Sequence, residues 1–224
     1  RKIHKISYEE MYELSLAGAK ILQARSVELA MRHNVHVRVL STFVDLPGTC
    51  VANDEFFTVK GMERLKITGI AHRHNIAKVE IETPSIDIIS TLLENGVPFE
   101  LLTQHEHEKA VHIAFLVEML YAEKIESFCD ELKNAGKILS ASVDRNVAAI
   151  SIVGTGVDAP AVQTIVKTCN DNNIPIMLLS ISSLKVSFVT TQQNSELAVF
   201  VLHAAFFQLD DQVENKNSNS NTPI

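Results

Sequence analysis

Cysteine is scarce in this chain of 224 residues, and the few thiols are poorly placed for cross-linking. Cys50, Cys129 and Cys169 are odd in number and widely spaced, whereas disulfide frameworks and zinc sites use closer, paired cysteines. The pattern favours free thiols in a reducing compartment. We therefore expect a cytoplasmic protein without a metal site.

Positive charge and long apolar runs are lacking too. The formal net charge is −7, whereas proteins that bind nucleic acid or anionic lipid usually carry a basic stripe. No apolar run approaches the roughly 18 residues that a membrane-spanning helix needs. The first ten residues, Arg1 to Glu10, are charged throughout, so we expect no signal peptide. These absences predict neither a nucleic-acid partner nor a membrane partner.

The N-terminal region has the strongest helical pattern. Ser7, followed by Glu10, fits a capping box, and apolar residues recur at helical spacing as far as Arg32. Gly18 interrupts this pattern, which predicts two helices rather than one. Residues 35–43 alternate between apolar and polar, as a strand does. A turn at 46–49 then predicts a domain edge, and we assign residues 1–60 to a first part and its linker.

The remainder of the chain contains a duplicated unit. Three pairs of similar segments follow one another in the same order at offsets of about 70 residues, as in a small duplicated domain. The pairs are 75–81 with 146–152, 95–103 with 172–180, and 111–115 with 184–188.

Each unit is predicted to follow the ferredoxin-like order βαββαβ. In the first unit we predict strands near 77–82, 98–103, 110–118 and 138–143, with helices near 85–95 and 122–134. In the second we predict helices near 159–172 and 195–207. We therefore divide the chain into modules at 61–143 and 144–210. The polar, Asn- and Ser-rich residues 211–224 are predicted to be a disordered tail.

Such paired units suit ligand sensing. Each is only about 70 residues long, so its own core is marginal. The strand at 111–116 has apolar side chains on both faces, which calls for a second layer from the other unit or from a second chain. Strand-to-helix loops at the resulting seam expose backbone amides, which bind carboxylates well. Folding physics alone leaves a sensor and a plain dimerisation module equally open.

Several segments resemble the aspartokinase (aspartate kinase) family. The similar stretches cover nearly the whole chain to about Leu209, and together they are highly specific: 6–14, 18–30, 37–43, 149–154, 179–187 and 196–206. The resemblance implies a mixed α/β (α+β) fold. The end of an amino-acid-kinase α/β domain would be followed by two ferredoxin-like ACT domains.

The resemblance also implies an activity. Aspartokinases phosphorylate the side-chain carboxylate of L-aspartate with ATP and Mg²⁺, the first step towards lysine, threonine and methionine. By resemblance, Lys20 and Ile21 lie near the bound nucleotide. The family's N-terminal motif and central catalytic stretches have no counterpart here, and phosphoryl transfer needs Mg²⁺ and a positive phosphate cradle. We therefore expect no catalytic residue and no kinase activity in this chain alone.

The resemblance places an amino-acid effector, lysine and/or threonine, in the first ACT module. Gln104 falls where threonine-sensitive members have a ligand-facing glutamine. Thr83 and Ser85 stand where many members have an Asp-x-Pro-Gly motif, and Asn75 is also assigned to the effector site. The second module lacks that Pro-Gly pair as well. A homodimer through the ACT modules is the expected assembly.

Two other functions remain open. The chain could be a stand-alone regulatory subunit, although the kinase-derived residues 1–45 argue mildly against this. It could also be a degenerate ACT pair that only dimerises. Two histidine groups, 105–108 and His72 with His74, are interpreted as solvated hairpin turns rather than metal ligands.

Overall fold

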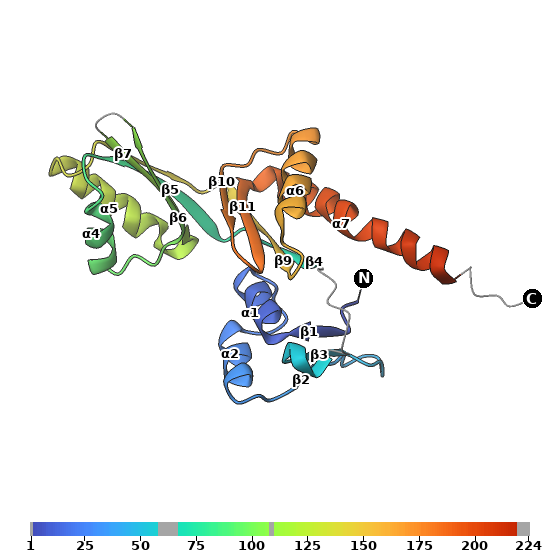
Figure 1. Cartoon of the computed structure of the whole chain (residues 1–224). Helices are drawn as coiled ribbons and strands as arrows, with labels where there is room; N and C mark the ends of the chain where they lie inside the picture. Colours follow the sequence, from blue (N-terminus) through green and yellow to red (C-terminus); the bar gives the residue numbers. More distant parts are fainter. Residues whose placement is uncertain (1, 58–66, 108–109, 219–224) are drawn as a thin grey trace, which may run out of the picture.

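The structure, a computed structural model, describes residues 2–57, 67–107 and 110–218, with side chains as far as Phe207. In these ranges the strands form one three-stranded and two four-stranded sheets (Figure 1). Helices cover one face of each four-stranded sheet, and the predicted mixed fold with paired ferredoxin-like units is confirmed. No described helix is long and apolar enough to cross a membrane.

The N-terminal unit is a small sheet with two helices beside it. Its elements are β1 (Lys5–Ser7), α1 (Tyr8–Leu16), α2 (Ala24–Arg32), β2 (Val37–Val39), β3 (Thr49–Ala52) and α3 (Asp54–Phe57). β3 lies between β1, to which it is parallel, and β2, to which it is antiparallel. The capping box is confirmed: the Glu10 amide donates to Ser7 Oγ, and the Ser7 amide donates to Glu10 Oε2, both at 3.2 Å. The predicted break at Gly18 is also confirmed.

Module 1 is a complete βαββαβ unit. Its elements are β5 (Ile76–Thr83), α4 (Ile88–Glu94), β6 (Glu100–His107), β7 (Ala110–Glu118), α5 (Ala122–Asn134) and β8 (Ser140–Asp144). The strand order is β6-β7-β5-β8, with every neighbouring pair antiparallel. Alternate residues of β5 and β7, including Ile81 and Ile113, pack against α4 and α5 and form the core. The opposite face of this sheet has no helix over it (Figure 1).

Module 2 repeats this arrangement with one rearrangement. Its elements are β4 (Ile67–Arg73), β9 (Val147–Gly154), α6 (Ala159–Asp171), β10 (Leu178–Ile181), β11 (Lys185–Thr191) and α7 (Ser195–Ser218). The strand order is β10-β11-β9-β4. The edge position that β8 fills in module 1 is filled here by β4, which precedes module 1 in the chain. Module 1 is therefore inserted between the first two strands of module 2.

This insertion corrects our assignment of residues 67–73 to the module at 61–143. The boundary at residue 61 itself lies outside the described residues. β4 pairs antiparallel with β9, so it belongs to module 2 rather than to module 1. The sequence does not reveal β4 because the strand is covered on both sides, by α7 and by α1, and lacks a clear alternation. Its buried residues include both Thr68 and Ala71.

Two local predictions also need correction. The strand expected at 35–43 is shorter, spanning Val37–Val39, because its flanking residues pair with no neighbour in the described sheet. Helix α7 continues to Ser218, well into the stretch predicted as a disordered tail, because Gln, Glu and Lys there are compatible with a helix. The remainder of that tail, 219–224, lies outside the described residues.

His72 and His105 are on strands rather than in turns, whereas His74 lies in the turn between β4 and β5. His72 belongs to β4, and His105 belongs to β6, which continues to His107. Strand β6 extends further than predicted because it pairs antiparallel with β7, and β4, which pairs with β9, was not predicted as a strand. Glu108 lies outside the described residues.

The N-terminal unit packs onto the face of the module 2 sheet opposite to α6 and α7 (Figure 1). Leu14 of α1 is buried with Ala71 of β4 and Val153 of β9. Two polar contacts fix the same interface. Thr68 Oγ1 donates to Glu10 Oε1 at 2.5 Å, and Lys185 Nζ lies 2.6 Å from Glu13 Oε2. Because Thr68 and Glu10 are both buried, this hydrogen bond fixes how α1 sits on β4.

The two four-stranded sheets meet near their ends through a small apolar cluster. It combines Ile76 and Leu116 of module 1 with Val147, Ala149 and Val189 of module 2. We call these five residues the junction cluster. The three units therefore meet in one region, around β4 and the turn that leads into β5.

Candidate functional site

A cavity of about 1080 Å³ lies in this region. It is bounded by the α1–α2 loop on one side and by β4 and the β4–β5 turn on the other. We call it the junction cavity, and its lining residues are Ser15, 18–24, 70–75 and Glu118.

The α1–α2 loop is seated tightly on β4. Gly18 has a φ of +100°, a conformation that glycine adopts far more readily than other residues. A Cβ at this position would lie 3.1 Å from the carbonyl oxygen of His72 and 3.3 Å from Cβ of Arg73. The loop is also closed internally, since the Ala19 amide donates to the Leu14 carbonyl at 2.9 Å. Glycine therefore allows the loop to approach β4 this closely without crowding or backbone strain.

Lys20 and Ile21, predicted to lie near a nucleotide, are both exposed and line the junction cavity. Asn75, predicted for the effector, lines the same cavity from the β4–β5 turn. The structure thus brings together residues that we had assigned to two different ligands. Asn75 precedes β5, whereas Thr83 ends it, so Asn75 lies at the opposite end of this strand from the other effector candidates.

Several basic residues are among those that line the junction cavity. Lys20, His72, Arg73 and His74 line it, with Glu118 as the one carboxylate among its lining residues. The rings of His72 and His74 are in edge-to-face contact, with their centroids 4.8 Å apart. The Arg73 guanidinium is bonded to Glu100, and His72 pairs with Ile150, whose side chain faces α6 and α7. Lys20 is therefore the clearest candidate to contact an anion in this cavity.

The other effector candidates lie at the far end of β5. Thr83 is 1% exposed, and its Oγ1 lies 3.1 Å from the Ser85 carbonyl oxygen and 3.3 Å from that of Lys137. The Ser85 hydroxyl donates to Asp87 Oδ2 at 2.9 Å. In this conformation the Thr83 hydroxyl closes the β5–α4 loop and does not face solvent. Ser85 is exposed and remains open to a ligand.

Gln104 is exposed on β6, an edge strand of the module 1 sheet. It pairs with Ile113 across the ladder, and Thr83 pairs with Val111. Directly paired residues point to the same face of a sheet, and the two apolar partners face the helices. Gln104 and Thr83 are therefore on the helix-covered face, at the same end of the module.

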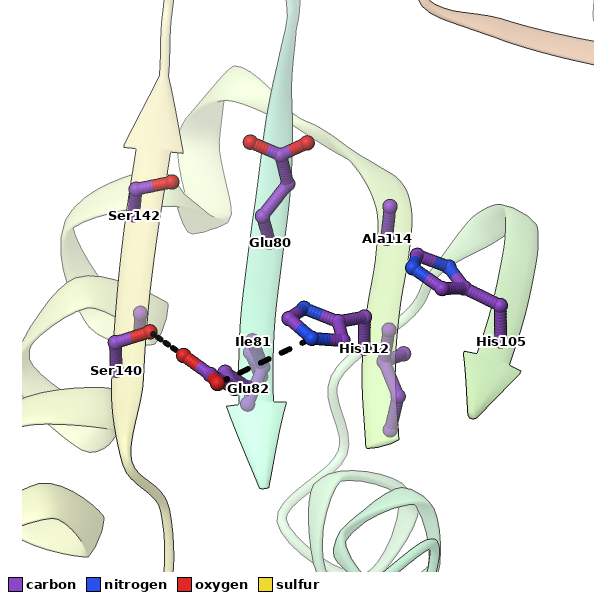
Figure 2. A pocket seen from close by; sticks show the side chains of 10 residues that line it. Glu80, Ile81, Glu82, His105, His112, Ala114, Ser140 and Ser142 are labelled. Atoms are coloured by element: carbon purple, nitrogen blue, oxygen red, sulfur yellow. Dashed lines mark hydrogen bonds and ion pairs between the residues drawn. The ribbon is translucent and has the colours of Figure 1, made fainter. Parts of the chain in front are cut away.

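The open face of the module 1 sheet has a polar hollow of about 410 Å³ (Figure 2). Glu82 is held between two strands: Ser140 Oγ donates to its Oε2 at 3.1 Å, and His112 Nε2 lies 3.9 Å from its Oε1. The imidazole of His105 stacks on that of His112, with their ring centroids 4.9 Å apart. Among the described residues, no group of three or more His, Cys, Asp or Glu could hold a metal ion.

No family model matches the chain. Curated relatives do. An aspartate kinase of Pseudomonas putida is 34% identical over 218 residues, which cover 92% of this chain and 52% of the relative. An aspartokinase of Pseudomonas aeruginosa is 33% identical over 216 residues, which cover 92% of this chain and 52% of the relative. The chain belongs to the aspartate kinase family. It spans about half the length of these relatives, 52% in both.

Solved aspartate kinase structures share the fold. The structure of Clostridium acetobutylicum aspartate kinase is 25% identical in sequence and matches with a TM-score of 0.77. The match covers 92% of this chain and 49% of the Clostridium chain. Escherichia coli aspartokinase III in complex with lysine and aspartate is 18% identical and matches with a TM-score of 0.68. The match covers 92% of this chain and 47% of the E. coli chain. The regulatory subunit of aspartate kinase from Thermus thermophilus is 22% identical and matches with a TM-score of 0.55. The match covers 62% of this chain and 98% of the Thermus subunit.

Proposed function

We propose that this chain is the amino-acid-sensing C-terminal region of an aspartate kinase. In the full-length protein, ATP phosphorylates L-aspartate to 4-phospho-L-aspartate, in the biosynthesis of lysine, threonine and methionine. The observation that carries the proposal is the close packing of the α1–α2 loop, which contains Lys20 and is called the Lys20 loop from here on, against β4. β4 is the strand that leads into module 1. The loop that we propose to border the nucleotide and the module that we propose to bind the effector therefore both adjoin β4.

The nucleotide would be held at the junction cavity. Lys20 would contact the phosphates of ATP·Mg²⁺, and Ile21, which is 60% exposed, would offer apolar surface beside it. Phosphoryl transfer also needs a phosphate cradle and Mg²⁺ ligands. We propose that the chain is inactive by itself, because the family's N-terminal motif and central catalytic stretches have no counterpart in its sequence.

The N-terminal unit has the surface of an incomplete domain. Three of its large apolar residues are strongly exposed: Leu40 at 58%, Phe43 at 95% and Leu46 at 57%. Exposed apolar residues in such a group mark a surface that packs against another body. This supports an N-terminal unit that completes a larger kinase domain.

The effector would bind at the end of module 1 where Gln104 and Ser85 lie. The carboxamide of Gln104 and the hydroxyl of Ser85 offer both donors and acceptors, which suits an amino acid with its ammonium and carboxylate groups. We propose lysine and/or threonine as the ligand. The E. coli aspartokinase III with a similar fold is solved in complex with lysine, which supports this class. The exposed edge strand β6 would place a second copy beside the site, as in a homodimer through the ACT modules.

The test is a thermal-shift titration of the chain with lysine, threonine, methionine and aspartate. A ligand at 100 times its dissociation constant stabilises the folded state by about 2.7 kcal/mol. In a chain of this size that raises the melting temperature by about 5–10 °C. Gln104→Ala is expected to abolish the shift, whereas the control Gln163→Ala, at an exposed position on α6, is expected to keep it. Absence of any shift in the unaltered chain contradicts sensing.

A second candidate is a stand-alone regulatory subunit. It is favoured by the Thermus subunit, 98% of which is covered by the present chain. That match covers only 62% of this chain, and the exposed apolar residues of the N-terminal unit need a partner surface. Co-purification with a separate kinase chain would favour this candidate. A degenerate ACT pair that only dimerises is the outcome if no amino acid binds.

A further inference from the structure

Arg73, the last residue of β4, joins the two modules through a two-point ion pair. Its Nη1 donates to Glu100 Oε1 at 3.1 Å, and its Nη2 donates to Glu100 Oε2 at 2.6 Å. Arg73 belongs to the module 2 sheet, whereas Glu100 begins β6 of module 1. A paired guanidinium and carboxylate hold a defined relative orientation, because two parallel bonds restrict rotation.

The backbone beside Glu100 is irregular, and this irregularity directs the Glu100 side chain towards Arg73. The register between β6 and β7 shifts between Glu100 and Thr103, as at a β-bulge. Leu101 has a φ of +51°, which is uncommon for a residue other than glycine. Bulges redirect side chains, and strained backbone persists only where surrounding contacts maintain it. Here those contacts come from the junction cluster, against which Leu101 packs.

The side-chain stem of Arg73 also supports the Lys20 loop. A Cβ placed on Gly18 would lie 3.3 Å from Cβ and 3.7 Å from Cγ of Arg73. The guanidinium Nε is buried and has no hydrogen-bond partner among the described residues, so Glu100 provides the polar contacts that orient the group. One side chain therefore bonds to β6 of module 1 and lies beside Gly18 in the loop that contains Lys20.

We infer that Arg73 is a positioning residue that couples module 1 to the Lys20 loop. A ligand that shifts β6 moves Glu100 and so changes its ion pair with the Arg73 guanidinium. The resulting movement of Arg73 changes how closely Gly18 packs against β4. Gln104 lies on the same strand as Glu100, four residues further along. The importance of this coupling for regulation rests on the proposed function, whereas the coupling itself is a property of the unliganded chain.

The experiment measures amide hydrogen exchange by NMR in the unliganded chain. The reporters are Ala19, whose amide donates to the Leu14 carbonyl at 2.9 Å, and Ile21, whose amide donates to the Ala19 carbonyl at 2.8 Å. Glu100→Gln removes the ion pair at an exposed position and should leave the fold intact. Arg73→Gln removes it from the other side. The double variant Arg73→Glu/Glu100→Arg restores the pair with reversed charges.

The control is Arg145→Gln. It removes another ion pair, in which Arg145 Nη2 lies 2.7 Å from Glu126 Oε2, and neither residue lines the junction cavity. We expect several-fold faster exchange at Ala19 and Ile21 in both single variants, recovery in the double variant, and no change in the control. Unchanged exchange in Glu100→Gln overturns the inference, as does an equal effect of Arg145→Gln. Failure of the amino-acid titration is a separate result, because no ligand is present here.

Discussion

Replacement of Gly18 by alanine tests how tightly the Lys20 loop is seated on β4. At a φ of +100° a Cβ is strained, which costs about 1–2 kcal/mol. The same Cβ would lie 3.1 Å from the His72 carbonyl oxygen, and crowding of this kind costs about 1–3 kcal/mol. We therefore expect Gly18→Ala to lower the free energy of unfolding by about 2–5 kcal/mol in total.

Two other glycines separate these contributions. Gly96 and Gly136 have φ values of +67° and +69°, and a Cβ at either would meet nothing within 4 Å. Alanine at these positions should therefore cost only the backbone strain, about 1–2 kcal/mol. The assay is urea unfolding followed by circular dichroism. If Gly18→Ala costs no more than the two controls, the loop is not packed against β4 and the proposed support of Lys20 is wrong.

Further predictions concern the module 2 core, the first helix and the thiols. Phe188→Ala, at a fully buried position, should cost about 3–5 kcal/mol, and Phe200→Ala, at a position that is 69% exposed, less than about 0.5 kcal/mol in urea unfolding. Ser7→Ala should cost about 1 kcal/mol in the same assay, because it removes the capping box of α1. Burial raises the pKa of the Cys129 and Cys169 thiols to about 11, so at pH 8 both stay protonated. Iodoacetamide should then modify Cys50 first by mass spectrometry; equal labelling of all three thiols in the folded chain would contradict this burial.

Elements whose signal is local were predicted well from the sequence. Strand β7 (Ala110–Glu118) and helix α5 (Ala122–Asn134) have the predicted bounds, because alternation and helical spacing are strong there. Strand β4 was missed because both of its faces are covered and its partner, β9, lies beyond the whole of module 1. The duplicated segments begin at β5 and β9, so they gave no indication of a strand preceding them.

The candidate site was predicted only in part, for a similar reason. Sequence reasoning selected Lys20 and Asn75 separately, but their shared cavity depends on how α1 packs on module 2. The ion pair of Arg73 with Glu100 joins residues that are far apart in the chain and depends on the bulge at Leu101. No local pattern encodes such a contact. The role of Thr83 in closing its loop was likewise visible only from its burial.

The most direct test of the account is an NMR titration of the isotopically labelled chain with lysine and, separately, with threonine. The account predicts that one of them shifts the amide resonances of Ser85 and Gln104, at the end of module 1. Smaller shifts should follow at Gly18 and Ala19, in the loop that β4 supports. Resonances that stay unchanged with both amino acids, or shifts confined to module 2, would contradict the claim that module 1 is the sensor.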